Sequence, residues 1–330
     1  MPDQTAAPHL TPDPYEYLHI IPNTDGSIGR PEEFHPITKA SCDPTQDVIS
    51  KDLVFNQSNN TWVRLYLPKK ALDSSSYTSK LPLMVYLHGG GFIILSAATP
   101  FFHDFCNTMA ADLSAVIVSV EYRNAPEHRL PAAYDDCVEA LHWIQTSPDE
   151  WLRDYADYSN CFIMGTSAGG NIAYHAGLRA AADIDHFKPL QIRGLILHQP
   201  FFGGSERSRS ELRSNDPVLP LFVSDLMWGL SLPIGSTRDH YYSNPTSGDD
   251  PKKYDLIKSL GWRVMVAGCS GDPLVDRQTQ VAQIMENAGL EVVTKFEEGG
   301  FHGVDVMDPS KTKVLLVAVK NFISLSSKST

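Results

Sequence analysis

The sequence has 330 residues, of which 42% are hydrophobic and 20% are charged, and its 39 acidic residues outnumber 27 basic ones to give a formal net charge of −12. This acidic balance, with lysines and arginines scattered along the chain, argues against a nucleic-acid-binding protein and against attachment to an anionic membrane surface. Length alone permits one large α/β domain or two smaller ones, so the number of domains has to come from the order of the elements.

The cysteines and the first residues indicate an intracellular protein. No CxxC pair and no Cys/His group at zinc spacing occurs, which is typical of reduced cysteines. The stretch from Met1 to Thr5 lacks the basic and apolar regions of a secretory signal, and apolar runs such as 81–87 are far shorter than the ~20 residues of a membrane span. We therefore expect a cytoplasmic location and no membrane span. The cysteines are Cys42, Cys106, Cys137, Cys161 and Cys269.

Residues 1 to about 45 are rich in Pro, Asp, Thr and His and show little periodicity. They are expected to form an irregular arm with room for one short hairpin at the turn signal Asn23–Gly26. From Asp47 onward the pattern changes to short apolar or alternating runs, which predict strands. The first three predicted strands cover 48–55, 62–67 and 81–87.

Farther along, apolar runs of strand length alternate with stretches of helical pattern. This alternation predicts a mostly parallel, doubly wound sheet with helices on both faces. The interval between about 200 and 260 breaks the alternation and is too long for an ordinary loop, so it is expected to form a helical cap over the sheet. The predicted strands are 115–120, 161–164, 192–197, 263–267 and 292–296, and the predicted helices are 131–146, 168–182, 273–289 and 310–325.

The stretch Gly165–Gly169 has the GxSxG pattern and lies between a predicted strand and a predicted helix. A serine at such a sharp turn needs small neighbours, because the strained backbone brings chain segments very close together. The pattern therefore marks Ser167 as a candidate nucleophile. A glycine-rich turn in which Ser167 caps the following helix would fit the same residues, and the pattern alone does not decide between the two.

A run of glycines, within His88–Phe92, follows the third predicted strand. Glycines present backbone N–H groups without side chains in the way, and the tetrahedral oxyanion of acyl transfer needs such donors. Esterases have this loop at the same strand-to-helix junction, so the expected donors are the amides of Gly90, Gly91 and Ala168. Gly89 is assigned to the bend, but the sequence leaves open which of the three glycines donate. Neither GxGxxG nor GxxxxGK is present, which weakens the alternative of a phosphate-binding loop.

An esterase also needs an acid and then a histidine after the serine, each at the C-terminal end of a later strand. Asp272 and His302 meet this demand, because they follow the last two predicted strands. Asp276 competes for the acid role, but it lies one helical turn later and is assigned to capping or loop bracing. Among the other histidines, His88 is expected to brace the glycine loop. No HExxH or clustered acid/His set suggests a metal.

Five motifs together carry a family resemblance, namely His88–Phe92, Tyr122–His128, Pro131–Asp136, Gly165–Asn171 and Asp272–Asp276. They resemble the hormone-sensitive-lipase branch of the α/β hydrolases and, within it, the plant carboxylesterases of the gibberellin-receptor-like family. The resemblance covers residues 45 to 325. It implies an α/β-hydrolase fold that forms a single domain over 1–330, with the arm at 1–45 and the segment at about 200–245 forming a lid.

The chain departs from that family in one motif position. Relatives usually carry Asp where this chain has Thr166, directly before the serine. That position is outside the catalytic triad, so we expect a change in hydrogen bonding at the pocket floor rather than a loss of activity. The receptor members lack the catalytic histidine, and the presence of His302 therefore favours an enzyme.

The predicted protein is a serine carboxylesterase that needs no cofactor and no metal. Ser167 is expected to attack an ester carbonyl, His302 to accept its proton, and Asp272 to orient the resulting imidazolium. Apolar residues of the cap suggest a small to medium, uncharged, mostly apolar ester, compatible with alkaloid or phenylpropanoid esters of plant specialised metabolism. The sequence leaves open the acyl and alcohol parts, and whether the protein is a monomer or a dimer.

Two other readings of the same scaffold stay open at this stage. The first is a non-hydrolytic enzyme, such as a dehydratase, a cyclase or a lactone-forming enzyme. The second is a binding protein that resembles a hormone receptor. Hydrolysis is preferred because it requires a complete Ser/Asp/His set with an oxyanion loop, which the alternatives merely tolerate.

Overall fold

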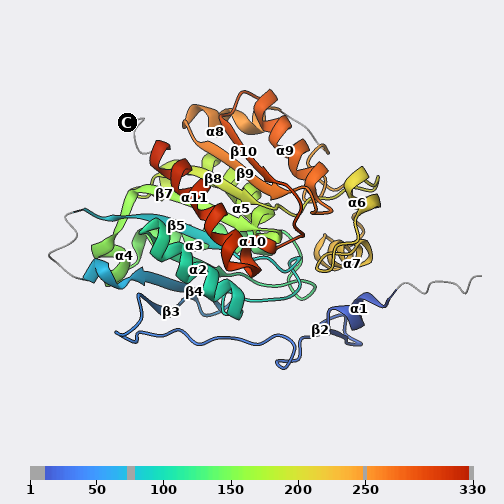
Figure 1. The fold of residues 1–330 in the computed structure, drawn as a ribbon, viewed down its shortest axis with the longest axis horizontal. Helices are drawn as coiled ribbons and strands as arrows, with labels where there is room; N and C mark the ends of the chain where they lie inside the picture. The colour runs from blue at the N-terminus through green and yellow to red at the C-terminus, as the bar shows by residue number, and fades with distance from the viewer. Residues whose placement is uncertain (1–11, 73–78, 248–250, 327–330) are drawn as a thin grey trace, which may run out of the picture.

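The computed structural model describes residues 12–72, 79–247 and 251–326. At its centre is an eight-stranded sheet with the order β10-β9-β8-β7-β5-β6-β4-β3 (Figure 1). Neighbours from β10 to β6 run parallel, and β4 pairs antiparallel with both β6 and β3. The prediction of a mostly parallel sheet is confirmed. The strands are β3 (Val48–Asn56), β4 (Thr61–Pro68), β5 (Leu81–Leu87), β6 (Val116–Glu121), β7 (Ala156–Thr166), β8 (Ile192–His198), β9 (Arg263–Cys269) and β10 (Val292–Glu297).

Helices cover both faces of this sheet, as the strand and helix alternation predicted. The buried side chains of α2 and α11 pack on one face, in front of the sheet in Figure 1, and those of α3, α5 and α9 pack on the other. The central strands are buried on both sides, which explains their continuous apolar runs. These helices are α2 (Pro100–Leu113), α3 (Ala132–Thr146), α5 (Ala168–Ala182), α9 (Val275–Asn287) and α11 (Pro309–Ser326).

Helix α2 was not anticipated from the sequence. It begins with Pro100, a residue favoured in the first helical turn, and buries Phe102, Phe105, Met109 and Leu113 at helical spacing against the sheet. Adjacent aromatics together with His, Asn and Thr lower the intrinsic helix preference of this segment. Packing of its apolar face therefore decides its structure.

The first described part of the arm, from α1 to β2, lies beside the cap at one end of the molecule (Figure 1). The expected hairpin is present as the antiparallel pair β1 and β2, and α1 precedes it; residues 1–11 of the expected arm lie outside the described residues. Tyr17 donates its hydroxyl proton to the carbonyl of Pro217, and its ring packs edge-on against Phe222 of α7 with 5.4 Å between centroids. Figure 1 shows α1 beside α7. The elements are α1 (Pro14–Tyr17), β1 (Ile21–Pro22), β2 (Ile28–Gly29), α6 (Arg209–Arg213) and α7 (Leu221–Ser231).

The remaining elements are short connections, apart from α10, which follows β10 at the same end of the sheet as the cap. In the part of the chain that the structure describes, no helix combines the length and the hydropathy that crossing a bilayer requires. These elements are η1 (Lys69–Leu72), α4 (Glu150–Tyr155), η2 (Ile184–Phe187), η3 (Pro251–Tyr254), α8 (Asp255–Ser259) and α10 (Val304–Met307).

Candidate active site

Ser167 lies at a sharp turn between β7 and α5, and its backbone φ of +57° is in the left-handed region that strains a non-glycine residue. Glycines make the turn sterically accessible. A Cβ at Gly165 would lie 2.0 Å from the carbonyl oxygen of Gly169, and a Cβ at Gly169 would lie 2.0 Å from the carbonyl oxygen of Leu87. Ser167 stands at the N-cap position of α5, but its side chain makes no capping hydrogen bond to the helix, so capping does not explain the serine.

The structure brings Ser167, His302 and Asp272 into one hydrogen-bonded chain. The distance from Ser167 Oγ to His302 Nε2 is 2.8 Å, and the distance from His302 Nδ1 to Asp272 Oδ2 is 2.9 Å. Asp272 is held in turn, because Gln278 Nε2 donates to Oδ2 and the amide of Leu274 donates to Oδ1, each at 2.8 Å. All three members of the chain are buried.

The surroundings of His302 favour its protonated form. Burial by itself lowers the pKa of the imidazole, but the charge and hydrogen bond of Asp272, together with the charge of Asp216, outweigh burial and raise the pKa above 6.5. A proton received at Nε2 is therefore stabilised where it arrives. This is the electrostatic property that a general base next to a serine needs.

The glycine loop is held by its carbonyl groups. Burial lowers the pKa of His88 to about 4, so the ring is neutral at pH 7, and its Nδ1 donates to the carbonyl of Gly89 at 2.7 Å. The carbonyl of Gly90 accepts from the amides of Ile93 and Ile94, at 3.1 Å each. Because the C=O and N–H of a trans peptide point in opposite directions, these bonds fix the directions of the Gly90 and Gly91 amides. The predicted bracing by His88 is confirmed.

The individual glycines have different roles from those expected in one respect. Positive φ values occur at Gly90 (+116°) and Gly91 (+59°), so the bend lies there and not at Gly89. A Cβ at Gly89 would lie 3.2 Å from the Cβ of Ser167, which makes Gly89 a point of close approach to the nucleophile turn. Among the described residues, the amides of Gly90, Gly91 and Ala168 donate to no acceptor of the protein, and Ala168 is the first residue of the 15-residue helix α5.

Two residues that hold the histidine loop were missed by sequence reasoning. Gln199, just after β8, donates from Nε2 to the carbonyl of Phe301 at 3.2 Å and accepts the amide of Gly303 at 2.7 Å. Asp216, in the cap, accepts the amide of His302 itself at 2.7 Å. No local pattern marks either residue, because each is recognised only by the distant backbone groups that it binds.

The remaining predictions about polar residues concern Thr166 and Asp276. Thr166 Oγ1 lies 2.9 Å from the hydroxyl of Tyr86 and 3.0 Å from Nδ1 of His198, so the residue in the unusual position has buried partners of its own. Asp276 accepts the amide of Ser210 in the cap at 2.8 Å, which confirms its assignment to bracing. Within the three described ranges, no three His, Cys, Asp or Glu side chains lie together in a way that suits a metal ion.

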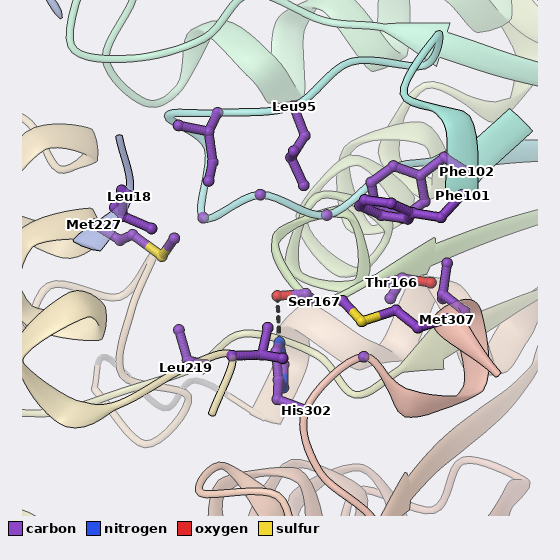
Figure 2. A pocket seen from close by; sticks show the side chains of 17 residues that line it. Leu18, Leu95, Phe101, Phe102, Thr166, Ser167, Leu219, Met227, His302 and Met307 are labelled. Atoms are coloured by element: carbon purple, nitrogen blue, oxygen red, sulfur yellow. Dashed lines mark hydrogen bonds between the residues drawn. The ribbon is translucent and has the colours of Figure 1, made fainter. Parts of the chain in front are cut away.

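Ser167 and His302 open onto a largely apolar cavity of about 90 Å³. Figure 2 shows side chains from the arm and the cap on one side of the serine, side chains from α2 and α10 on the other, and Leu95 of the loop after β5 above it. The arm contributes Leu18, which therefore helps to close the site. The arm and the cap contribute Leu18, Val218, Leu219 and Met227 to the lining, and the other apolar side chains of the lining are Ile94, Leu95, Phe101, Phe102, Val306 and Met307.

The sheet order, with a serine on the strained turn after β7 and its partners after β9 and β10, defines the chain as an α/β hydrolase. Residues 84–306 match the family described as alpha/beta hydrolase fold. The chain is 55% identical over 315 residues to Carboxylesterase 20 of Arabidopsis thaliana, covering 94% of this chain and 96% of that one. It belongs to the plant carboxylesterase family of the hormone-sensitive-lipase type.

Two further comparisons agree with this assignment. The 3-O-acetylpapaveroxine carboxylesterase CXE2 of Papaver somniferum is 44% identical over 321 residues, covering 94% of this chain and 99% of that one. A hyperthermophilic esterase from the archaeon Pyrobaculum calidifontis has a similar structure, with a TM-score of 0.69 over 84% of this chain and 83% of that one, at 24% identity. At 24% identity, this structural similarity supports the fold alone.

Proposed function

We propose that this chain is a serine carboxylesterase that works through an acyl-enzyme. The observation that carries the proposal is the chain of hydrogen bonds from Ser167 through His302 to Asp272 at the floor of an apolar cavity. Ser167 Oγ bonds to the ester carbonyl carbon while its proton moves to His302 Nε2, and Asp272 stabilises the imidazolium. The alcohol then leaves with that proton, and water repeats the sequence to release the acid.

The oxyanion of each tetrahedral intermediate would be held by the amides of Gly90, Gly91 and Ala168. Support comes from the fixed orientation of the two glycine amides and from the position of Ala168 at the N-terminus of α5. The unsatisfied N–H groups at a helix N-terminus carry a partial positive charge, which favours an anion there. Donors that are already oriented need no reorganisation when the charge develops.

The substrate is proposed to be an uncharged ester with a short acyl group. Apart from Thr166, Ser167 and His302, the cavity is lined by apolar side chains and glycine backbone, so a charged group would enter without a partner. Its volume of about 90 Å³ favours a short acyl chain over a long one. One Papaver relative is named for an acetyl ester of papaveroxine, which is consistent with a small acyl group on a larger alcohol.

The arm and the cap are proposed to form a lid, so that the whole chain acts as a single domain. Leu18 from the arm and Met227 from α7 line the same cavity as His302, and Tyr17 joins the arm to the cap. Closing such a cavity excludes water and strengthens the electrostatic interactions inside it. A cytoplasmic location stays a prediction.

Product analysis in water labelled with heavy oxygen tests the proposal. Short acetyl and propionyl esters should be hydrolysed faster than octanoyl esters of the same phenol, with the label in the acid product and a fluorophosphonate probe bound covalently to the protein. Rearranged or eliminated product without label would instead favour the non-hydrolytic alternative. Tight binding of the ester without turnover or probe labelling would favour a receptor.

The pH dependence of hydrolysis should follow His302. The ring has to be neutral to accept the serine proton, and its pKa is raised above 6.5, so kcat/KM should rise with pH and reach half its maximum above pH 6.5. The measurement is kcat/KM for p-nitrophenyl acetate between pH 5 and 9, followed where phenol and phenolate absorb equally. A half-maximum below pH 6.5 would mean that Asp272 and Asp216 do not raise the pKa of the ring.

Gly90→Ala should lower kcat by about 10²- to 10³-fold, the effect of losing one oxyanion donor. The new Cβ would lie 2.0 Å from the carbonyl oxygen of Ile94, and the φ of +116° is strained for alanine, so the loop has to move. The matched control is Gly229→Ala in α7, where a Cβ meets nothing within 4 Å. Steady-state kinetics should separate the two variants, and equal activities would remove Gly90 from the site.

A further inference from the structure

Asp216 lies in the cap between α6 and α7, with 5% of its surface exposed. Its carboxylate binds backbone groups of two distant segments. Oδ2 accepts the amide of His302 at 2.7 Å, and Oδ1 accepts the amides of Val218 and Leu219 at 2.8 Å each. One buried side chain therefore satisfies three backbone donors.

The two cap residues in this arrangement belong to the wall of the substrate cavity. Val218 and Leu219 line it together with Ser167 and His302. Figure 2 shows Leu219 beside His302. A carboxylate that fixes both segments therefore holds the wall of the cavity and the histidine at a constant separation.

Other residues also hold the loop around His302, but none of them binds the backbone amide of His302. Gln199 binds the carbonyl of Phe301 and the amide of Gly303, so it holds the residues on either side. Asp272 binds the ring. The amide of His302 itself donates to Asp216, and a buried amide that loses its acceptor is strongly disfavoured.

Asp216 also faces the histidine as a charge. The other charged or titratable groups around the His302 loop are Asp272 on the ring, Asp305 paired with His198, and Cys269, whose Sγ lies 3.6 Å from the carbonyl of Phe301. Burial raises the pKa of the Cys269 thiol to about 11, so it is neutral at pH 7. Arg213, which is exposed, lines a polar cavity together with Asp216 and Asp272. Of these groups, Asp272 and Asp216 raise the pKa of His302.

We propose that Asp216 is a positioning residue of the hydrolytic reaction, which couples the cavity wall at Val218 and Leu219 to the general base His302 and supplies negative charge to its imidazolium. The inference rests on the proposed function, because it assigns His302 the role of base. It adds that the cap takes part in setting the protonation of the base as well as the shape of the cavity.

The test is Asp216→Asn, with Asp216→Glu and Asp276→Asn beside it. The amide side chain of Asp216→Asn has one acceptor oxygen, so it cannot serve His302 and the Val218–Leu219 pair together. We expect kcat at the pH plateau to fall about tenfold through misplacement of the base. The acid limb of the pH profile, which is the rise of kcat/KM as His302 loses its proton, should move to lower pH. The reason is that the lost charge no longer raises the pKa of His302.

Asp216→Glu keeps the charge with a longer side chain, so it should leave the acid limb in place while lowering kcat. Asp276→Asn is the matched control, because Asp276 also accepts a backbone amide of the cap without contacting His302, and it should leave the limb in place. Fluorophosphonate titration of active sites restricts each measurement to folded enzyme. An unmoved limb in Asp216→Asn, or an equal movement in Asp276→Asn, would overturn the inference.

The same titration separates this inference from the proposed function. If wild-type protein is not labelled, or if Ser167→Ala is labelled equally, the serine mechanism itself is wrong. If labelling depends on Ser167 but the acid limb stays at the same pH in Asp216→Asn, only the role of Asp216 is wrong.

Discussion

Ser167→Ala should lower kcat for p-nitrophenyl acetate by about a millionfold, leaving only the residual ~10³- to 10⁴-fold acceleration over buffer that the oxyanion donors and the cavity supply by themselves. Among the residues that the structure describes, Ser167 Oγ hydrogen-bonds only to His302 Nε2, so removing the oxygen takes away the nucleophile and little else. Alanine keeps the Cβ that already occupies the strained φ of +57°. The fold, the glycine loop and the cavity should therefore persist in the variant.

The measurement compares initial rates and thermal unfolding of the wild type, Ser167→Ala and the control Ser205→Ala, which alters an exposed serine of the cap segment. We expect full activity in the control and a similar unfolding temperature in all three proteins. Turnover by Ser167→Ala close to the wild-type rate, with fluorophosphonate labelling retained, would place the nucleophile elsewhere.

Asp272→Asn should lower kcat by about 10³- to 10⁴-fold while leaving substrate binding nearly unchanged. Oδ2 accepts from both His302 Nδ1 and Gln278 Nε2, and Oδ1 accepts from the amide of Leu274. An asparagine that keeps its oxygen toward Leu274 presents N–H to the ring, so the proton of His302 moves to Nε2. In that tautomer Nε2 has no lone pair for the serine proton.

This variant is best compared with Asp276→Asn, four residues along the chain. Asp276 braces the amide of Ser210 and has no contact with the imidazole, so the control should lose stability but little activity. The comparison uses kcat and KM at several pH values. Equal losses of kcat in the two variants would contradict the assignment of Asp272 as the acid.

The sequence located Ser167, Asp272 and His302 because each stands at the end of an apolar strand, where a parallel sheet gathers residues from distant parts of a chain. It did not locate Asp216 or Gln199. Their partners are backbone amides and carbonyls near residue 302, and backbone groups leave no mark on a residue pattern.

The order of the main strands was predicted from the sequence, but the start of β7 and the presence of α2 were not. The apolar stretch 161–164 indicated β7, but the strand begins at Ala156, because Ala156 and Asp157 pair with Leu81 and Pro82 of β5 before a shift in the register. Helix α2 was not predicted, because contacts with the sheet and not its local sequence determine it. Its sequence is a poor helix former in isolation, and burial against the sheet outweighs that preference.

The division of the site between the sheet and its surroundings has a consequence for how relatives diverge. The reacting groups come from strand ends, whereas most of the apolar wall comes from the arm, the cap and α2. Replacements at Leu18 or Met227 therefore alter which esters fit while the reacting groups stay in place. At Val218 and Leu219 the backbone has to stay in place, because its amides share the carboxylate that holds His302. New specificities should therefore arise through side-chain replacements in the lining, whereas insertions or deletions directly after Asp216 should disturb His302.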